Sequence, residues 1–345
     1  MLNKEGAKLS QGTTRSRSSF IIHHSAFNVA VMGVLVLLSA PWSSAVAQVY
    51  PAKPVRILVG FAPGGGTDIM ARVIGAKMTE SVKQQFIIEN RPGANANLAA
   101  KLAAEAPADG YTILFMSVAH IMSKPVYKNL GYDIERDFSP ITVVSEVSNV
   151  FAAHPSLPAK TVKELIALAR SKPGELTYAT SGVASPEHFA GEMFKMMTKT
   201  NLLPVPYKGG GPIAIDLMAG HVITSFSTMP PIIPHIRAGR VKALAVTSGK
   251  RAAVLPDVPT IAETVPGYAM STWYGAVVPA KTPREVVVRL NQEMVKALAA
   301  PDVKERLASL GADIVATSPE ETAAIFRADL AKYTKVAQAA KIQAD

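Results

Sequence analysis

The chain has 345 residues, 48% of them hydrophobic, so it is long and apolar enough to form one large domain or two. It contains no cysteine, which excludes disulfides, thiolate metal sites and cysteine nucleophiles. The formal net charge is +10, but no basic run with interleaved aromatic residues occurs, which argues against nucleic-acid binding.

Residues 1–47 have the pattern of an export signal. A basic start is followed by an uncharged, mostly apolar stretch at 26–40, and Ala45-Val46-Ala47 forms a cleavage site before Gln48. We therefore predict a periplasmic protein that is cleaved after Ala47. Removing 1–47 takes four basic residues from 36 and one acidic residue from 26, which leaves 32 and 25 and a net charge of +7. A retained membrane anchor is the alternative, but the apolar stretch is short for a span of about 20 residues.

A glycine loop follows the first predicted strand. Residues 55–60 form an apolar, β-branched run, Gly64-Gly65-Gly66 comes next, and apolar residues recur at helical spacing over 69–81. Glycines let the backbone adopt positive φ and bring bare N–H groups to a ligand, and a helix start adds unpaired N–H donors. Such a loop can hold an anion, although it lacks the residues of a nucleotide loop. The loop by itself slightly favours the other interpretation, a plain turn with Thr67 or Asp68 as the helix N-cap.

The rest of the chain alternates between strand and helix patterns. Further strands are predicted at 85–89, 112–116, 141–153, 176–180, 203–207, 222–227, 242–247 and 273–279. Further helices are predicted at 97–106, 162–171, 186–198, 213–219, 283–299, 301–310 and 319–342. This alternation predicts an α/β fold with parallel sheets. Turns rich in glycine, serine or threonine follow strands at 60–68, 180–185 and 207–211, where α/β proteins bind ligands, so we expect two lobes facing a cleft.

Ordered motifs along nearly the whole chain after residue 50 resemble those of the Bug proteins, extracytoplasmic receptors related to tripartite tricarboxylate transporters. The motifs are PAKPVRILVGFAPGGGTD (51–68), ENRPGA (89–94), ADGYT (108–112), YATSG (178–182), VPYKG (205–209), AGRVKALAVTS (238–248) and LPDVPT (255–260). The resemblance implies a type II periplasmic binding fold, in which two α/β lobes are joined by two crossing strands and enclose the ligand. We expect the crossings at 141–153 and 273–279, lobe 1 at 48–150 and 272–345, and lobe 2 at 151–271.

The resemblance also implies a binding site. The loops at 61–68 and 181–188 are expected to hold one ligand carboxylate, largely through backbone N–H groups and waters. The expected ligand-binding residues are Phe61, Ala62, Gly64, Gly65, Gly66, Thr67, Asp68, Ser117, Ser181, Ser185, His188, Tyr207 and Ser227. Structural roles compete for several of them, because Ser181 and Ser185 can cap the next helix and Tyr207 can belong to the core.

The chain departs from the family pattern at Ala184, where glycine is usual, and at Ile223 and Ser227, where acids are common. Without an acid at residue 227 a ligand ammonium loses one partner, so we expect a dicarboxylate or aromatic carboxylate rather than an amino acid. We expect a monomer without enzyme activity, cofactor or metal, which serves a tripartite tricarboxylate-type transporter or a sensor kinase. The alternatives are a membrane-tethered sensing module and a periplasmic serine hydrolase using Ser181 or Ser185 with His188, for which no positioned acid is evident.

Overall fold

A computed structural model describes residues 50–344 of the protein, and the predicted export signal at 1–47 lies outside the described residues. The strands are β1 (Val55–Val59), β2 (Phe86–Asn90), β3 (Thr112–Ser117), β4 (Phe138–Ala153), β5 (Thr177–Thr180), β6 (Leu203–Pro206), β7 (Thr224–Thr228), β8 (Lys242–Val246), β9 (Ser271–Pro279) and β10 (Ala312–Ile314). The helices are α2 (Gly66–Val82), α3 (Asn97–Ala104), α4 (Ala119–Ser123), α5 (Val162–Ser171), α6 (Pro186–Thr198), α7 (Gly210–Ala219), α8 (Met229–Arg237), α9 (Arg284–Ala299), α10 (Pro301–Ser309) and α11 (Pro319–Ala339), with a short 3₁₀ turn at Ile261–Glu263.

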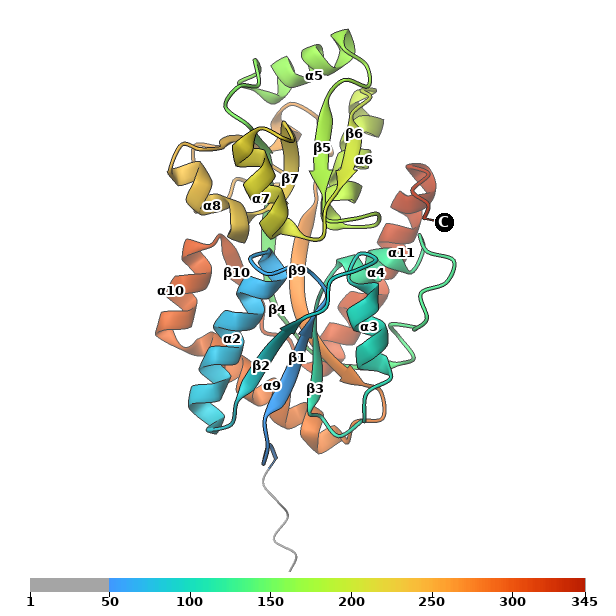
Figure 1. The fold of residues 1–345 in the computed structure, drawn as a ribbon, viewed down its shortest axis with the longest axis vertical. Coiled ribbons are helices and arrows are strands. Elements are labelled where there is room, and N and C mark those ends of the chain that lie inside the picture. The colour runs from blue at the N-terminus through green and yellow to red at the C-terminus, as the bar shows by residue number, and fades with distance from the viewer. Residues whose placement is uncertain (1–49, 345) are drawn as a thin grey trace, which may run out of the picture. The chain divides into compact units, whose positions relative to one another are not determined.

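Strand β4 joins two α/β lobes. The strand order is β2-β1-β3-β9-β4-β7-β5-β6, and β8 and β10 also pair with β4. Residues 138–148 of β4 pair with β9 in lobe 1, whereas residues 149–153 pair with β7 in lobe 2. Figure 1 shows β1, β2 and β3 on one side of this junction and β5, β6 and β7 on the other. One long strand therefore belongs to both lobes, as the sequence predicted for 141–153.

The second crossing lies directly before the strand predicted at 273–279. β9 pairs with β3 and with residues 138–148 of β4, so the strand at 273–279 lies in the sheet of lobe 1. The chain still packs on lobe 2 at Tyr268, whose hydroxyl donates to the carbonyl of Ala190 on α6, so it crosses to lobe 1 between Tyr268 and Ser271, where β9 begins. The residue-level boundaries of the two lobes stay a prediction.

The sheets are mixed rather than wholly parallel. β1 pairs in parallel with β2 and β3, and β5 pairs in parallel with β6 and β7, as the alternating pattern predicted. The pairs that involve β4 or β9 are antiparallel. Both lobes consequently direct the carboxyl ends of their parallel strands, and the loops that follow them, toward the junction (Figure 1).

Each lobe has an apolar core that fixes these loops. In lobe 1 the side chains of Val55, Ile57 and Val59 on β1 are buried with those of α2. In lobe 2 the ring of Phe151 on β4 stacks on Phe226 of β7, with the ring centroids 4.1 Å apart. Among residues 50–344 no helix is both long enough and apolar enough to cross a membrane.

Candidate ligand-binding site

The glycine loop connects β1 to α2, and only one of its glycines has positive φ. Gly64 has φ +79°, but Gly65 is the N-cap of α2 with φ −79°, and Gly66 is the first helical residue. The expectation of positive φ along the loop is therefore wrong for Gly65 and Gly66. Thr67 and Asp68 lie inside the first helical turn, so neither is the N-cap considered from the sequence.

Only glycine fits at residue 66. A methyl group at this position would overlap the hydroxyl group of Tyr274, which lies on β9. The N–H groups of Gly66 and Thr67 belong to the first turn of α2, where the helix itself offers no acceptor. Together with the positive end of the helix dipole they favour an anion at this end of α2.

Asp68 serves the structure of this corner. Its carboxylate accepts hydrogen bonds from the backbone N–H of Gly64 at 2.9 Å, from the side chain of Arg72 at 3.0 Å and from that of Asn90 at 2.9 Å. Burial opposes its ionisation, but these three hydrogen bonds and the charge of Arg72 outweigh burial and lower the pKa of Asp68. Asp68 therefore holds the glycine loop on α2 as an ionised, fully partnered group.

The second loop connects β5 to α6 in lobe 2. Ser185 is the N-cap of α6, and its Oγ accepts the backbone N–H of His188 at 3.2 Å. The imidazole Nδ1 of His188 accepts the backbone N–H of Ala184 at 3.3 Å, and burial lowers the pKa of His188. Ala184 has φ +66°, a left-handed conformation that costs a non-glycine residue about 1–2 kcal/mol. Ser185 and His188 thus brace a loop that adopts a glycine-like conformation without a glycine.

A buried glutamate occupies the start of α6. The hydroxyl of Ser181 donates a hydrogen bond to Oε2 of Glu187 at 2.6 Å, and Glu187 is 3% exposed. Burial raises the pKa of Glu187, although hydrogen bonds from Ser181, Ser185 and nearby backbone N–H groups oppose that rise. No ion pair within residues 50–344 involves this carboxyl group.

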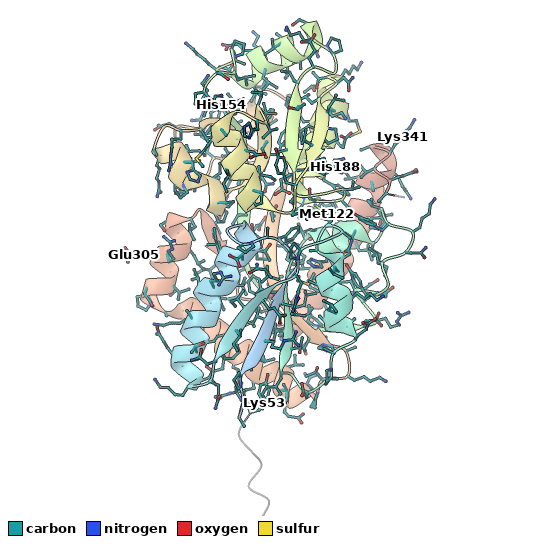
Figure 2. All side chains as sticks on the ribbon, viewed as in Figure 1. Lys53, Met122, His154, His188, Glu305 and Lys341 are labelled. Carbon is teal, nitrogen blue, oxygen red and sulfur yellow. The ribbon has the colours of Figure 1, made fainter. Side chains whose placement is uncertain are left out.

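The two loops enclose a cavity at the junction of the lobes. Figure 2 labels Met122 and His188, which lie on opposite sides of this junction. The lining residues are Phe61, Gly65, Gly66, Thr67, Ser117, Ser181, Pro186, Glu187, Gly210, Thr228, Thr272 and Tyr274. The cavity volume is about 20 Å³, which is room for a water molecule. The Tyr274 hydroxyl is buried beside Thr228 and has no hydrogen-bond partner among the described residues, so the cavity holds an unused polar group.

The lobes touch directly next to this cavity. The backbone N–H of Ala62 in lobe 1 donates to the carbonyl of Lys208 in lobe 2 at 2.9 Å. A methyl group on Gly211 would overlap the carbonyl oxygen of Pro63. The lobes are therefore in contact, and the first cavity as it stands has no room for a group larger than water.

A second cavity of about 180 Å³ adjoins the first and shares Phe61 and Ser181 with it. Its wall includes Ala94, Asn95 and Ala96, whose φ angles are +46°, +52° and +71°. Three consecutive non-glycine residues in this conformation carry strain, and strain concentrates at functional sites. The side-chain oxygen of Asn95 is buried without a hydrogen-bond partner among residues 50–344. The second cavity therefore offers a further acceptor beside the first.

The structure brings together about half of the residues expected at the site. Those lining the first cavity are Phe61, Gly65, Gly66, Thr67, Ser117 and Ser181. Tyr207 lines the second, although its hydroxyl donates to Asp216. Those lining neither cavity are Ala62, Gly64, Asp68, Ser185, His188 and Ser227. Lining residues that sequence reasoning missed are Pro186, Glu187, Gly210, Thr228, Thr272 and Tyr274.

The serines do not form a hydrolase arrangement in the described residues. Ser181 donates to Glu187, and Ser185 accepts a backbone N–H, so neither hydroxyl bonds an imidazole nitrogen. Nucleophilic serines need a base within hydrogen-bond reach and a third group that orients it.

A sequence model described as the tripartite tricarboxylate transporter family receptor matches residues 70–342. The chain belongs to this family. The receptor is 37% identical over 306 residues to a UPF0065 protein from a Pseudomonas species, which covers 87% of this chain and 91% of the relative. Receptors of this family are periplasmic binding proteins rather than enzymes.

Solved structures of relatives share the fold of this receptor. The Rhodopseudomonas palustris protein Rpa4515 with adipate is 38% identical, with a TM-score of 0.83 over 85% of this chain and 99% of that one. MatC from Rhodopseudomonas palustris with bound malate is 30% identical, with a TM-score of 0.80 over 83% of this chain and 99% of that one. The type II periplasmic binding fold expected from the sequence is confirmed.

Proposed function

We propose that this receptor captures a small carboxylate in the interlobe cavity and delivers it to a tripartite tricarboxylate-type transporter or to a sensor. The observation that supports this most is the start of α2, where Gly66 and Thr67, whose N–H groups have no acceptor within the helix, line the first cavity. Adipate and malate in the two related structures are both dicarboxylates, which supports the same ligand class here.

A dicarboxylate suits the two adjoining cavities. One carboxylate would lie at the start of α2, and the remainder of the molecule would extend past Phe61 and Ser181 into the second cavity. An aromatic carboxylate would place its ring in the same second cavity. We also propose that the receptor works as a monomer.

We also propose that the protein is exported and cleaved after Ala47, because Ala45-Val46-Ala47 follows an apolar stretch. N-terminal sequencing of the protein recovered from the periplasm tests this. A mature chain that retains 26–40 and stays with the membrane would support the tethered sensing module instead.

Calorimetric titration tests the ligand class. The protein is unfolded and refolded to remove retained ligand, then titrated with adipate, malate, phthalate and benzoate, with aspartate and the dimethyl ester of adipate as contrasts. We expect carboxylates to bind and the uncharged ester to fail. Ser181→Ala should weaken binding about ten- to a hundredfold, because it disrupts a buried hydrogen bond at the cavity. The exposed Ser156→Ala in the same lobe is the matched control. If no carboxylate binds, or if the ester binds equally well, the proposal fails.

A further inference from the structure

Among residues 50–344, Glu187 is the only carboxyl group lining the first cavity, and none of the twelve lining residues is lysine, arginine or histidine. The cavity proposed for a carboxylate ligand therefore contains a carboxyl group of the protein itself. At 3% exposure this group has little contact with water, so its charge is not stabilised by solvation.

The groups around Glu187 supply hydrogen bonds but no compensating positive charge. On its own loop and helix they are the hydroxyls of Ser181 and Ser185. From β9 the facing titratable group is Tyr274, which is neutral at ordinary pH. His188 follows Glu187, but burial lowers its pKa and so disfavours its charged form. On α2 the charged groups of the first two turns are Asp68 and Arg72, which pair with each other at 2.8 Å.

A ligand carboxylate held at Gly66 and Thr67 would share this small closed space with Glu187. Two ionised carboxylates in the same small cavity repel each other strongly, and a proton shared between them removes this repulsion. The result is a short O–H···O⁻ hydrogen bond, which is stronger than a neutral one.

We propose that Glu187 contacts the ligand carboxylate as a neutral carboxylic acid, so that the receptor holds its ligand together with a proton. The inference rests on the proposed function, because it takes the ligand to be a carboxylate. The proton sits on Glu187 and comes from solvent, and no bond of the ligand changes.

The pH dependence follows from the order of two pKa values. Burial raises the pKa of Glu187 above 4.5 in the free protein, and the bound anion raises it further. At pH values below the pKa of Glu187 in the free protein, Glu187 is already protonated, so its protonation does not change the ligand affinity with pH. Between the two values the affinity falls up to tenfold for each pH unit, because binding must take up one proton.

Infrared difference spectroscopy and calorimetry together test the proposal. The refolded protein is titrated with adipate and with malate from pH 5 to 9, and infrared spectra of the complexes are recorded with ¹³C-labelled ligand. We expect the C=O stretch of an unlabelled carboxylic acid in the pH 7 complex and its absence from Glu187→Gln. The variant carries a neutral hydrogen-bond donor, so it should bind within about threefold of the wild type at pH 5, with an affinity that does not fall toward pH 9. The matched control is Glu164→Gln, an exposed acid in the first turn of α5.

The infrared C=O band of protonated Glu187 decides whether the proposal holds. A pH 7 complex without this band would overturn the proposal, as would a folded Glu187→Gln protein that binds neither probe at pH 5 while the wild type does. Tightest binding of aspartate, with Glu187 ionised, would overturn it in favour of an ammonium partner. If neither wild type nor variant binds any carboxylate at any pH, the proposed function fails as well, which distinguishes the two failures.

Discussion

A carboxyl group buried as deeply as that of Glu187 affects the stability of the protein as well as its binding. Its pKa is raised in the folded state above its ordinary value of 4.5, so the unfolded chain ionises first as pH rises. The folded state therefore loses up to about 1.4 kcal/mol of stability per pH unit above 4.5, until the folded-state pKa is reached.

We expect Glu187→Gln to remove this loss, since glutamine does not titrate and its oxygen can still accept from Ser181. Without ligand, the variant should unfold at a higher temperature than the wild type at pH 8, and the difference should shrink toward pH 4.5. Thermal unfolding followed by circular dichroism at both pH values measures it, with Glu164→Gln as control. The same pH dependence in wild type and Glu187→Gln would show that Glu187 is not buried as described.

At the residue scale the sequence located the loops better than the side chains. Gly65, Gly66, Thr67 and Ser181 follow strands, and positions after parallel strands are where α/β proteins bind. Glu187 has the pattern of an ordinary acid in a first helical turn, and only the packing shows its burial. The position of Glu187 directly after Pro186 was the available sequence signal, because it lies in the loop at 181–188 that we expected to bind the ligand.

Ser227 and Thr228 show a second limit of sequence reading. Neighbouring strand residues point to opposite faces of a sheet, so a choice between them needs the register. In the structure Thr228 lines the cavity, whereas the hydroxyl of Ser227 donates to Ser225 at 2.9 Å. The argument against amino-acid ligands drawn from residue 227 therefore concerns a side chain outside the cavity, while Glu187 places an acid within it.

At the scale of elements, the starts of α2 and α7 meet across the junction of the lobes. The chain before α2 contacts the chain before α7 through the Ala62–Lys208 hydrogen bond, and Gly211 lies against the carbonyl of Pro63. These contacts are between backbone atoms, which cannot rotate out of the way as a side chain can. Small residues at both helix starts are therefore a condition for closure.

Gly211→Ala tests this condition. The added methyl group would overlap Pro63 only in the closed form, so each lobe should fold normally while closure becomes less favourable. We expect ligand affinity measured by calorimetry to fall about tenfold or more, which corresponds to about 1.4 kcal/mol, and the unfolding temperature without ligand to change little. Gly249→Ala is the control, because the new methyl group would meet only Ala269 at 3.9 Å. Unchanged affinity in Gly211→Ala would mean that the lobes bind ligand without this contact.

Most elements were predictable because local pattern and burial agree. The strand at 141–153 and the helices of both lobes follow from apolar periodicity, and the structure confirms them within a few residues. α8 was missed because it contains three prolines: Pro230 and Pro231 fit a first turn, but Pro234 lies in its interior. The residue at which the chain returns to lobe 1 was not predictable, because the pairing of β9 with β3 is set by tertiary contacts, which periodicity does not encode.

At the scale of the whole molecule, the first cavity measures only about 20 Å³, so we expect hinge motion to make room for a carboxylate at the start of α2. After cleavage Trp273 would be the only tryptophan in the chain. Its indole N–H donates to Asp329 at 2.6 Å, and its ring stacks on Phe326 with centroids 5.3 Å apart. Both partners lie on α11, where Tyr333 contacts Phe189 of lobe 2. A movement of lobe 2 therefore reaches the surroundings of Trp273 through α11.

We expect Trp273 fluorescence to change when a carboxylate closes the lobes, and the same ligand to raise the unfolding temperature. At 100 times its dissociation constant a ligand stabilises the fold by about 2.7 kcal/mol. For a protein of this size that corresponds to a rise of roughly 5–10 °C. Titrating the refolded protein with adipate, malate, phthalate and benzoate, and then recording melting curves, gives both signals. The Gly211→Ala variant distinguishes a fluorescence change caused by lobe closure from one caused by ligand contact alone. At saturating ligand this variant should show a reduced fluorescence change. A full fluorescence change in this variant would mean that Trp273 responds to the ligand without closure, since the variant disfavours the closed form.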